Sequence, residues 1–296
     1  MENSVLARNV LLMSALDGIA SAAAGKGLDL VVLKGAALLY EGLRPMAARE
    51  MTDLDLLIKP GKEKAFDELM TASGFVPMEN SSQAYYRTTG GGAPPVVVDI
   101  HTGLWHERDT AALWHRSRFL AAGAPPERGD EGRLKGLGFE DQFLHLASHP
   151  LLYHGEMTPR CLEDLSVLLE RIYAGTDRGS FWLKAAEIAR AGGLGAVVYP
   201  VLRRLRGLNP GLISGDELSS FRPRGAGTLL GLFFERAARG HSRRMEYLLP
   251  GLYRPGLFFR YMFPGRTFME RRYGKDSAGN RLKRAFRLVR ALLGKD

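Results

Sequence analysis

The sequence predicts an α/β domain with a mixed sheet, followed by an all-helical C-terminal domain. Helix-like and strand-like segments alternate over roughly the first 105 residues, which is typical of an α/β fold. After Trp105 the apolar residues recur at helical spacing, and we find no convincing strand. The segment from Gly123 to Gly138 is rich in glycine, proline and charge, as linkers often are. We therefore expect an α/β domain at residues 1–122 and a helical domain at residues 139–296.

The predicted α/β domain begins with a helix. Apolar side chains from Ser4 to Ala24 recur at helical spacing, and Gly25 ends the pattern. The run from Leu28 to Leu33 is short and aliphatic, as a buried strand requires. The same criteria predict further helices at residues 36–43 and 62–73, and further strands at residues 53–58, 83–88 and 96–101. The last two strands flank a glycine-rich turn and are expected to pair in antiparallel fashion.

Helical periodicity also describes the rest of the chain. Helices are predicted at residues 141–147, 159–174, 181–191, 194–206, 225–239 and 280–293. No internal repeat is found in this part of the sequence. The fold class is therefore an α/β domain and a separate helical domain.

The composition is that of an ordinary globular protein, with 45% hydrophobic and 25% charged residues. The single cysteine, Cys161, excludes an intrachain disulfide and fits a reducing compartment. The N-terminus lacks a basic region, and charged residues interrupt its apolar stretch, so we do not expect a signal peptide. No uncharged apolar run reaches the roughly 18 residues of a membrane-spanning helix. We expect a cytoplasmic protein, peripheral to the membrane if its basic tail binds lipid.

The net charge of +9 is concentrated at the C-terminus. Residues 231–296 contain 16 Lys or Arg and 5 Asp or Glu, whereas the rest of the chain contains 25 and 27. From Arg236 to Lys295 arginines alternate with aromatic residues, a pattern that suits single-stranded RNA. The amphipathic pattern from Arg281 to Leu293 equally suits an anionic membrane surface. A solvated basic rim around a helical core explains the same residues without either partner.

Two aspartates in the second predicted strand form the first part of a candidate metal site. Asp53 and Asp55 lie two residues apart, so their side chains project from the same side of a strand. Two such carboxylates repel each other unless a cation lies between them, and Mg²⁺ prefers oxygen ligands. A third carboxylate, Asp99, lies in the β-branched run that forms the last strand, and His101 shares its face. Asp99 could complete the metal site or accept a proton, and His101 could orient a ligand or substrate.

A candidate phosphate-binding loop precedes these aspartates. Lys34 and Gly35 follow the first strand directly, and a helix is expected to start at Ala36. Glycine lets the backbone approach a phosphate closely, and the helix N-terminus favours an anion. Lys34 adds a positive charge. Arg49 and Thr52, just ahead of Asp53, could supply a second cation and a hydroxyl to the same phosphates.

These three segments, taken in order, resemble a known family. They are Leu33-Lys34-Gly35, then Arg49-x-x-Thr52-Asp53-Leu54-Asp55, then Val98-Asp99-Ile100-His101. The order is similar to that of an uncharacterised bacterial nucleotidyltransferase family in the DNA polymerase β-like superfamily, and to the abortive-infection toxin nucleotidyltransferases. The resemblance covers roughly residues 1–175. It departs from the superfamily in two respects: Ala36 stands where a glycine or serine usually follows, and the gap between Gly35 and Asp53 is longer.

The resemblance implies a polymerase β-like nucleotidyltransferase domain. It makes Asp53, Asp55 and Asp99 the ligands of Mg²⁺ or Mn²⁺, and it makes Gly35 the phosphate-loop glycine. The implied reaction transfers a nucleoside monophosphate from an NTP such as ATP to a hydroxyl. The acceptor stays open: a tRNA end, a protein, a sugar or a peptide natural product. The alternative is a degenerate nucleotidyltransferase scaffold that binds RNA or a membrane surface through its basic tail.

Overall fold

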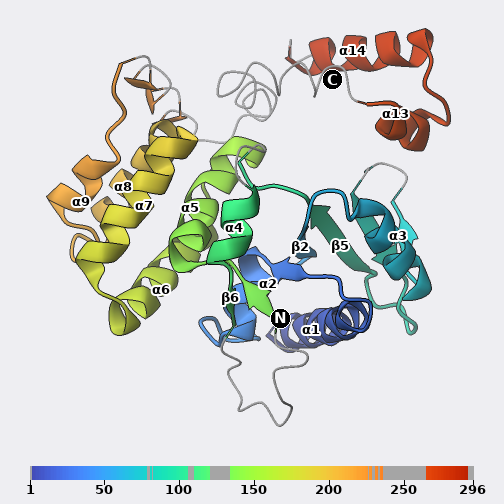
Figure 1. Ribbon diagram of the computed structural model, residues 1–296, viewed down its shortest axis with the longest axis horizontal. Coiled ribbons are helices and arrows are strands. Elements are labelled where there is room, and N and C mark those ends of the chain that lie inside the picture. Colours follow the sequence, from blue (N-terminus) through green and yellow to red (C-terminus); the bar gives the residue numbers. More distant parts are fainter. Residues whose placement is uncertain are drawn as a thin grey trace. The chain divides into compact units, whose positions relative to one another are not determined.

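The computed structural model describes residues 2–78, 81, 83–105, 110–120, 134–225, 227–228, 231–232, 234–235 and 265–292. The chain divides into two compact units, Met1–Gln142 and Phe143–Asp296. The first unit combines a sheet with helices, and the described elements of the second unit are helices (Figure 1). The predicted fold class is therefore confirmed.

The first unit contains a mixed sheet of seven strands among its described residues. The strands β2 and β5 run parallel at its centre, β1 is antiparallel to β2, and β4 is antiparallel to β5. The sheet order is β3-β4-β5-β2-β1-β7-β6. The strands are β1 (Leu30–Val32), β2 (Leu54–Ile58), β3 (Val76–Pro77), β4 (Ala84–Arg87), β5 (Val96–His101), β6 (Arg118–Phe119) and β7 (Lys135–Gly136).

Side-chain alternation gives the two faces of β2 and β5 different environments. Every second residue, including Leu56 and Val98, enters the main hydrophobic core. That core also contains residues of the helices α1 (Glu2–Gly25), α2 (Lys34–Tyr40) and α3 (Glu63–Ala72). The residues between them face the other side of the sheet, where a smaller apolar cluster includes Leu57 and Leu113. Leu113 belongs to α4 (Thr110–Arg116), a helix that the sequence analysis did not predict.

The first helix, α1, contributes one face to the core. Its buried side chains recur at helical spacing from Leu12 to Ala23. Contrary to our expectation, residues Asn3–Gly25 are long and apolar enough to cross a membrane by length and composition. Between Asn3 and Gly25 the helix has two charged residues, Arg8 and Asp17, so it contains no long uncharged run and yet is apolar on average. One face of α1 packs in the main core near β5 and α3, and Figure 1 shows the helix beside the sheet.

Two strands of the sheet correct the prediction that no strand follows Trp105. β6 and β7 pair with each other, and β7 runs parallel to β1. The sheet thus continues past residue 122, where the predicted domain ended. Each of these strands has only two residues, which is too short to show an alternating pattern. Their membership in the sheet depends on pairing with β1, which local sequence does not reveal.

The second unit is helical throughout its described residues. Polar side chains cap several helices: Thr158 accepts from Cys161 N, and Asp177 accepts from Ser180 N. This unit also contains an aromatic cluster with edge-to-face ring contacts, formed by Phe143, Phe181, Trp182 and Phe221. The helices are α5 (Phe139–His149), η1 (Pro150–His154), α6 (Pro159–Gly175), α7 (Arg178–Gly192), α8 (Gly195–Leu208), α9 (Gly215–Ser220), α13 (Arg266–Tyr273) and α14 (Ala278–Leu292).

The basic tail is only partly described. The helix predicted at residues 225–239 and the aromatic-rich stretch at residues 236–264 lie largely outside the described residues. The predicted helix at residues 280–293 corresponds to α14, and α13 precedes it. The tail therefore contains at least these two helices.

Candidate active site

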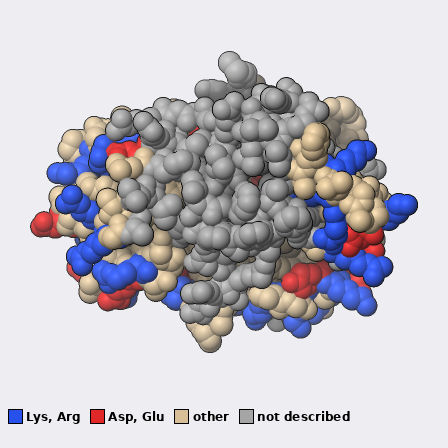
Figure 2. Space-filling view, turned by 90° about the horizontal axis from the view of Figure 1, so that it is seen from above, with Lys and Arg blue, Asp and Glu red and all other residues tan. Residues whose placement is uncertain are grey.

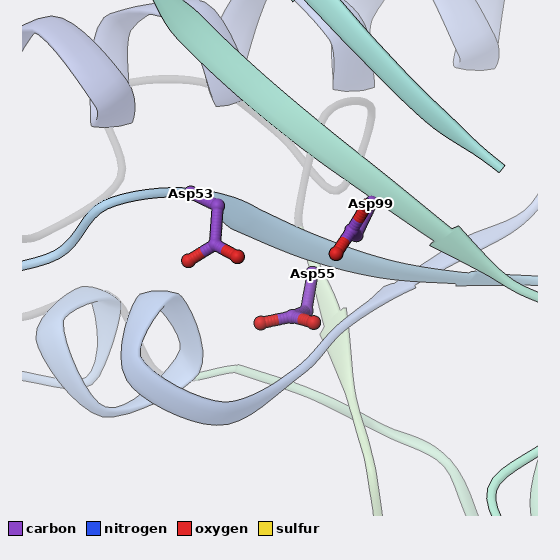
Figure 3. A group of neighbouring side chains, drawn as sticks. All are labelled: Asp53, Asp55 and Asp99. Carbon is purple, nitrogen blue, oxygen red and sulfur yellow. The ribbon is translucent and has the colours of Figure 1, made fainter. Parts of the chain in front are cut away.

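Three carboxylates converge at the centre of the sheet. Asp53 immediately precedes β2, Asp55 lies within it, and Asp99 lies opposite Asp55 on the parallel neighbour β5. One oxygen from each of these side chains lies within 4.8 Å of the others. Figure 3 shows Asp53 and Asp55 projecting from the same side of β2, with Asp99 leaning towards them from β5. The sequence pattern and the parallel register thus bring the three predicted residues together.

Asp55 is the most buried of the three, and two hydrogen-bond donors contact its carboxylate. The Lys34 Nζ atom lies 2.6 Å from Asp55 Oδ1, and His101 Nε2 lies 2.8 Å from the same oxygen. Burial alone would raise the pKa of Asp55. The hydrogen bond from His101 and the charge of Lys34 outweigh this effect and hold the pKa well below its ordinary value. Asp55 therefore stays ionised across the physiological pH range.

Asp99 has the opposite electrostatic environment. Burial raises the pKa of Asp99, and the negative charge of Asp55 raises it further. Two neighbouring carboxylates with pKa values displaced in opposite directions are often an ionised ligand and a proton acceptor. This division of roles is thus available at the site.

Gly35, the second residue of α2, allows Arg49 to lie directly against the backbone at the start of that helix. The helix begins at Lys34, two residues before the predicted start at Ala36. A Cβ atom added at Gly35 would lie 1.9 Å from Arg49 Nη1 and 2.4 Å from Arg49 Cζ. No side chain larger than hydrogen fits while the guanidinium occupies this position. The preceding residue, Lys34, adopts a left-handed backbone with φ of 48°. The predicted loop residues Lys34, Gly35 and Arg49 thus form one compact basic group.

Two residues of α1 hold the segment that leads into β2, and the sequence analysis missed both. The buried Asn9 side chain donates from Nδ2 to the carbonyl oxygens of Met46 and Arg49, each at 2.6 Å, and accepts from Met51 N at 3.2 Å. Arg8 donates to the carbonyl of Thr52 at 2.7 Å. These bonds fix the backbone on both sides of Arg49. An asparagine within an apolar helical run is the signal that could have identified the contact.

The remaining predicted site residues lie close by but differ in their exposure. Thr52 is exposed, and its hydroxyl donates to Asp53 Oδ1 at 2.9 Å. Ala36 is only 2% exposed and packs in the main core. Its side chain therefore faces apolar neighbours, and only its backbone could serve a ligand. His101 lies against Asp55 rather than against Asp99, whose face of β5 it shares.

The arrangement provides oxygen donors next to a basic group. Three carboxylates that approach within 4.8 Å offer a hard, oxygen-only ligand set. Mg²⁺ and Mn²⁺ favour such sets, whereas zinc sites are usually built from nitrogen and sulfur ligands. The Lys34 ammonium contacts Asp55, and the Arg49 guanidinium lies against Gly35, the residue after Lys34. Both cations are suited to an anionic substrate. The residues therefore fit a divalent cation together with a phosphate-bearing ligand.

Comparison with protein families gives a match that spans most of the chain. A family model described as an uncharacterised nucleotidyltransferase matches residues 2–208. Comparisons with curated proteins and with solved structures found no match. The matched region includes Asp53, Asp55 and Asp99, together with the Lys34-Gly35 loop. It continues through α8, so the helical unit shares in the match up to residue 208.

Proposed function

The chain belongs to the uncharacterised nucleotidyltransferase family, and we propose that it transfers a nucleoside monophosphate from an NTP to a hydroxyl acceptor. The observation that supports this reaction is the convergence of Asp53, Asp55 and Asp99 within 4.8 Å. These residues would hold Mg²⁺ or Mn²⁺. Bound there, a divalent cation would offset the charge of the phosphates and favour ionisation of the attacking hydroxyl. The proposed acceptors are a tRNA end, a protein, a sugar or a peptide.

In the proposed reaction the acceptor hydroxyl oxygen forms a bond to the α-phosphorus. The bond from that phosphorus to the pyrophosphate oxygen breaks, and pyrophosphate leaves. Asp99 accepts the hydroxyl proton, because its raised pKa makes it a better base than an ordinary carboxylate. Lys34 and Arg49 orient the triphosphate through charge-assisted hydrogen bonds. Gly35 permits this orientation because it leaves room for the Arg49 guanidinium.

The direct test is label transfer from α-labelled NTPs to candidate acceptors in the presence of Mg²⁺ or Mn²⁺. We expect Asp53→Asn and Asp55→Asn each to lower transfer by about a thousandfold, the scale of losing one strong electrostatic contact to the transition state. The exposed Glu68→Gln on α3 is a matched carboxylate-to-amide control and should retain full activity. A folded protein that binds no NTP with either metal would exclude the enzymatic function.

A second candidate function concerns α14. This helix contains five Lys or Arg residues and no Asp or Glu. Leu282 is 74% exposed and Phe286 is 66% exposed, and their four-residue spacing places them on one helical face. In the view of Figure 2, Lys and Arg are interspersed with Asp and Glu among the described residues. We propose that α14 binds an anionic lipid surface, which would make the protein peripheral to a membrane.

Sedimentation with vesicles tests this contact. Vesicles containing phosphatidylglycerol should bind the protein, and vesicles of phosphatidylcholine alone should not. Phe286→Ser should weaken binding several-fold, whereas Leu183→Ser, an exposed leucine on α7, should not. Salt-sensitive binding to single-stranded RNA that is unaffected by Phe286→Ser would instead favour RNA as the partner. If the wild type shows no transfer activity, and lipid or RNA binding persists in Asp53→Asn, the non-enzymatic scaffold would be favoured.

A further inference from the structure

Two donors from different elements meet on a single oxygen of Asp55. Lys34 Nζ lies 2.6 Å from Asp55 Oδ1, and His101 Nε2 lies 2.8 Å from the same atom. A carboxylate oxygen has two lone-pair positions, so these contacts engage both positions of Oδ1. A cation that binds through Oδ1 must therefore displace one of the two donors.

Lys34 is the donor whose position depends on an unusual backbone. It is the one non-glycine residue with positive φ among the described residues, at 48°. That conformation is strained for a residue with a Cβ atom. The neighbouring Leu33 N–H donates to the carbonyl of Asp55 at 3.0 Å, which ties this turn to β2. His101, in contrast, lies within the regular strand β5.

We propose that Lys34 is a positioning residue that competes with the divalent cation for Asp55 and so couples cation binding to nucleotide binding. The proposal rests on the proposed function for the identity of both ligands. The Lys34 ammonium is held by one carboxylate, and the phosphates of an NTP offer it several charged oxygens instead. When the ammonium moves to the phosphates, Asp55 Oδ1 becomes available. Each ligand then favours the binding of the other, and this coupling is reciprocal.

The experiment measures Mn²⁺ affinity without nucleotide, by electron paramagnetic resonance of free Mn²⁺ during a titration. Lys34→Met removes the ammonium and keeps a long side chain. We expect Mn²⁺ to bind this variant about fivefold tighter or more than the wild type, within the usual range of coupling between sites. The affinity for a non-hydrolysable NTP analogue should fall in the same variant. A residue with only a structural role would not shift the two affinities in opposite directions.

Three further variants serve as controls. Lys34→Gly removes the same charge and suits the left-handed backbone, so it protects the test against misfolding of Lys34→Met. Lys59→Met also removes one lysine charge from this unit, but Lys59 pairs with Asp29 at 2.5 Å and not with the carboxylate cluster. It should leave Mn²⁺ affinity unchanged. Asp55→Asn should weaken Mn²⁺ binding and thereby locate the cation at this site.

The outcomes separate this proposal from the proposed reaction. Tighter Mn²⁺ binding in both Lys34 variants, with no change in Lys59→Met, supports competition for Asp55. Unchanged or weaker Mn²⁺ binding in both Lys34 variants overturns it, as does the absence of Mn²⁺ binding in all proteins. Because this titration contains no nucleotide, a failure of nucleotidyl transfer leaves the result unaffected.

Discussion

The two faces of strands β2 and β5 differ sharply in composition, although alternate residues of the same two strands form them. On one face Leu56 and Val98 are fully buried in the main core. On the other face Asp55 and Asp99 lie opposite each other in register. The first face contributes apolar burial to stability. The second gathers negative charge, which folding must tolerate.

The charged face, which carries Asp55 and Asp99, is compatible with folding because hydrogen-bond donors contact one of the two carboxylates. Lys34 and His101 compensate Asp55, whose pKa is lowered despite its burial. The pKa of Asp99 is instead raised, by burial first and by the neighbouring Asp55. One carboxylate is therefore stabilised by its surroundings and the other is not. Functional sites commonly hold such destabilising groups in otherwise stable frameworks.

The largest effect should follow from Asp99→Asn, which keeps the shape of the side chain and removes the base. Transfer activity should fall by about 10²- to 10⁴-fold, as for the loss of a general base. The measurement is single-turnover transfer at saturating NTP and metal. If activity stayed within threefold of the wild type, Asp99 would not be the proton acceptor. Circular dichroism should show an unchanged fold, because the amide keeps the shape of the carboxylate and Asp99 has no stabilising environment to lose.

Leu56→Ala should lower stability and leave the activity of the folded protein intact, which is the reverse of the effect of Asp99→Asn. Leu56 is fully buried in the main core, so its truncation removes apolar contacts and leaves a cavity. The free energy of unfolding should fall by about 2–5 kcal/mol. Activity per folded molecule should be retained at temperatures well below the transition. Val76→Ala on the edge strand β3 is the matched control, because Val76 is 50% exposed and should change stability by less than about 0.5 kcal/mol. An equal loss in both variants would contradict the assigned core.

The sequence was sufficient to predict the parts of the site that are encoded locally. Asp53 immediately precedes β2 and Asp55 lies within it, so their common orientation follows from the two-residue period of extended backbone. The bounds of β5 were also predicted, because a β-branched run follows the glycine-rich turn directly. The proximity of Asp99 needed one further assumption, that β5 neighbours β2, and the parallel register confirms it.

Contacts between segments distant in sequence could not be predicted in the same way. Asn9 binds the loop before β2, about 40 residues away, and nothing in helical periodicity identifies that partner. Lys34 was assigned to the triphosphate from its place in the loop, yet the structure puts its ammonium against Asp55. The strand β7 depends on pairing with β1, and its two residues carry no pattern of their own. These features are set by tertiary packing, which local sequence does not specify.

Gly35→Ala should produce a smaller effect, which acts through the position of Arg49. The new methyl group would displace the Arg49 guanidinium, because a Cβ atom would lie 1.9 Å from its Nη1 atom. A guanidinium at the end of a flexible side chain can move, so stability should change little. The KM for NTP should rise by about tenfold, equivalent to losing one charge-assisted hydrogen bond. Gly18→Ala in α1, where a Cβ atom meets nothing within 4 Å, should leave KM unchanged.

The smallest expected effect is a dependence of stability on pH that has opposite signs for the two aspartates of the charged face. Asp99 has a folded pKa above its ordinary value of 3.8. The folded protein therefore binds the Asp99 proton more tightly than the unfolded chain does, and stability falls as pH rises from that value through the folded pKa. Asp55 has a folded pKa below 3.8, so its contribution is present above that pH and is lost only in strong acid.

Chemical unfolding in EDTA, from about pH 3.5 to pH 8, compares wild type with each asparagine variant. Near pH 3.5 Asp99 is mostly protonated and resembles asparagine, so Asp99→Asn should match the wild type. Towards neutral pH this variant should become more stable than the wild type, since it lacks the buried charge. Asp55→Asn should be less stable than the wild type at neutral pH, because it loses its ion pair with Lys34. Two difference curves of the same sign at neutral pH would contradict the opposite environments of Asp55 and Asp99. The assignment of Asp55 as ionised ligand and Asp99 as base would then lose its electrostatic support.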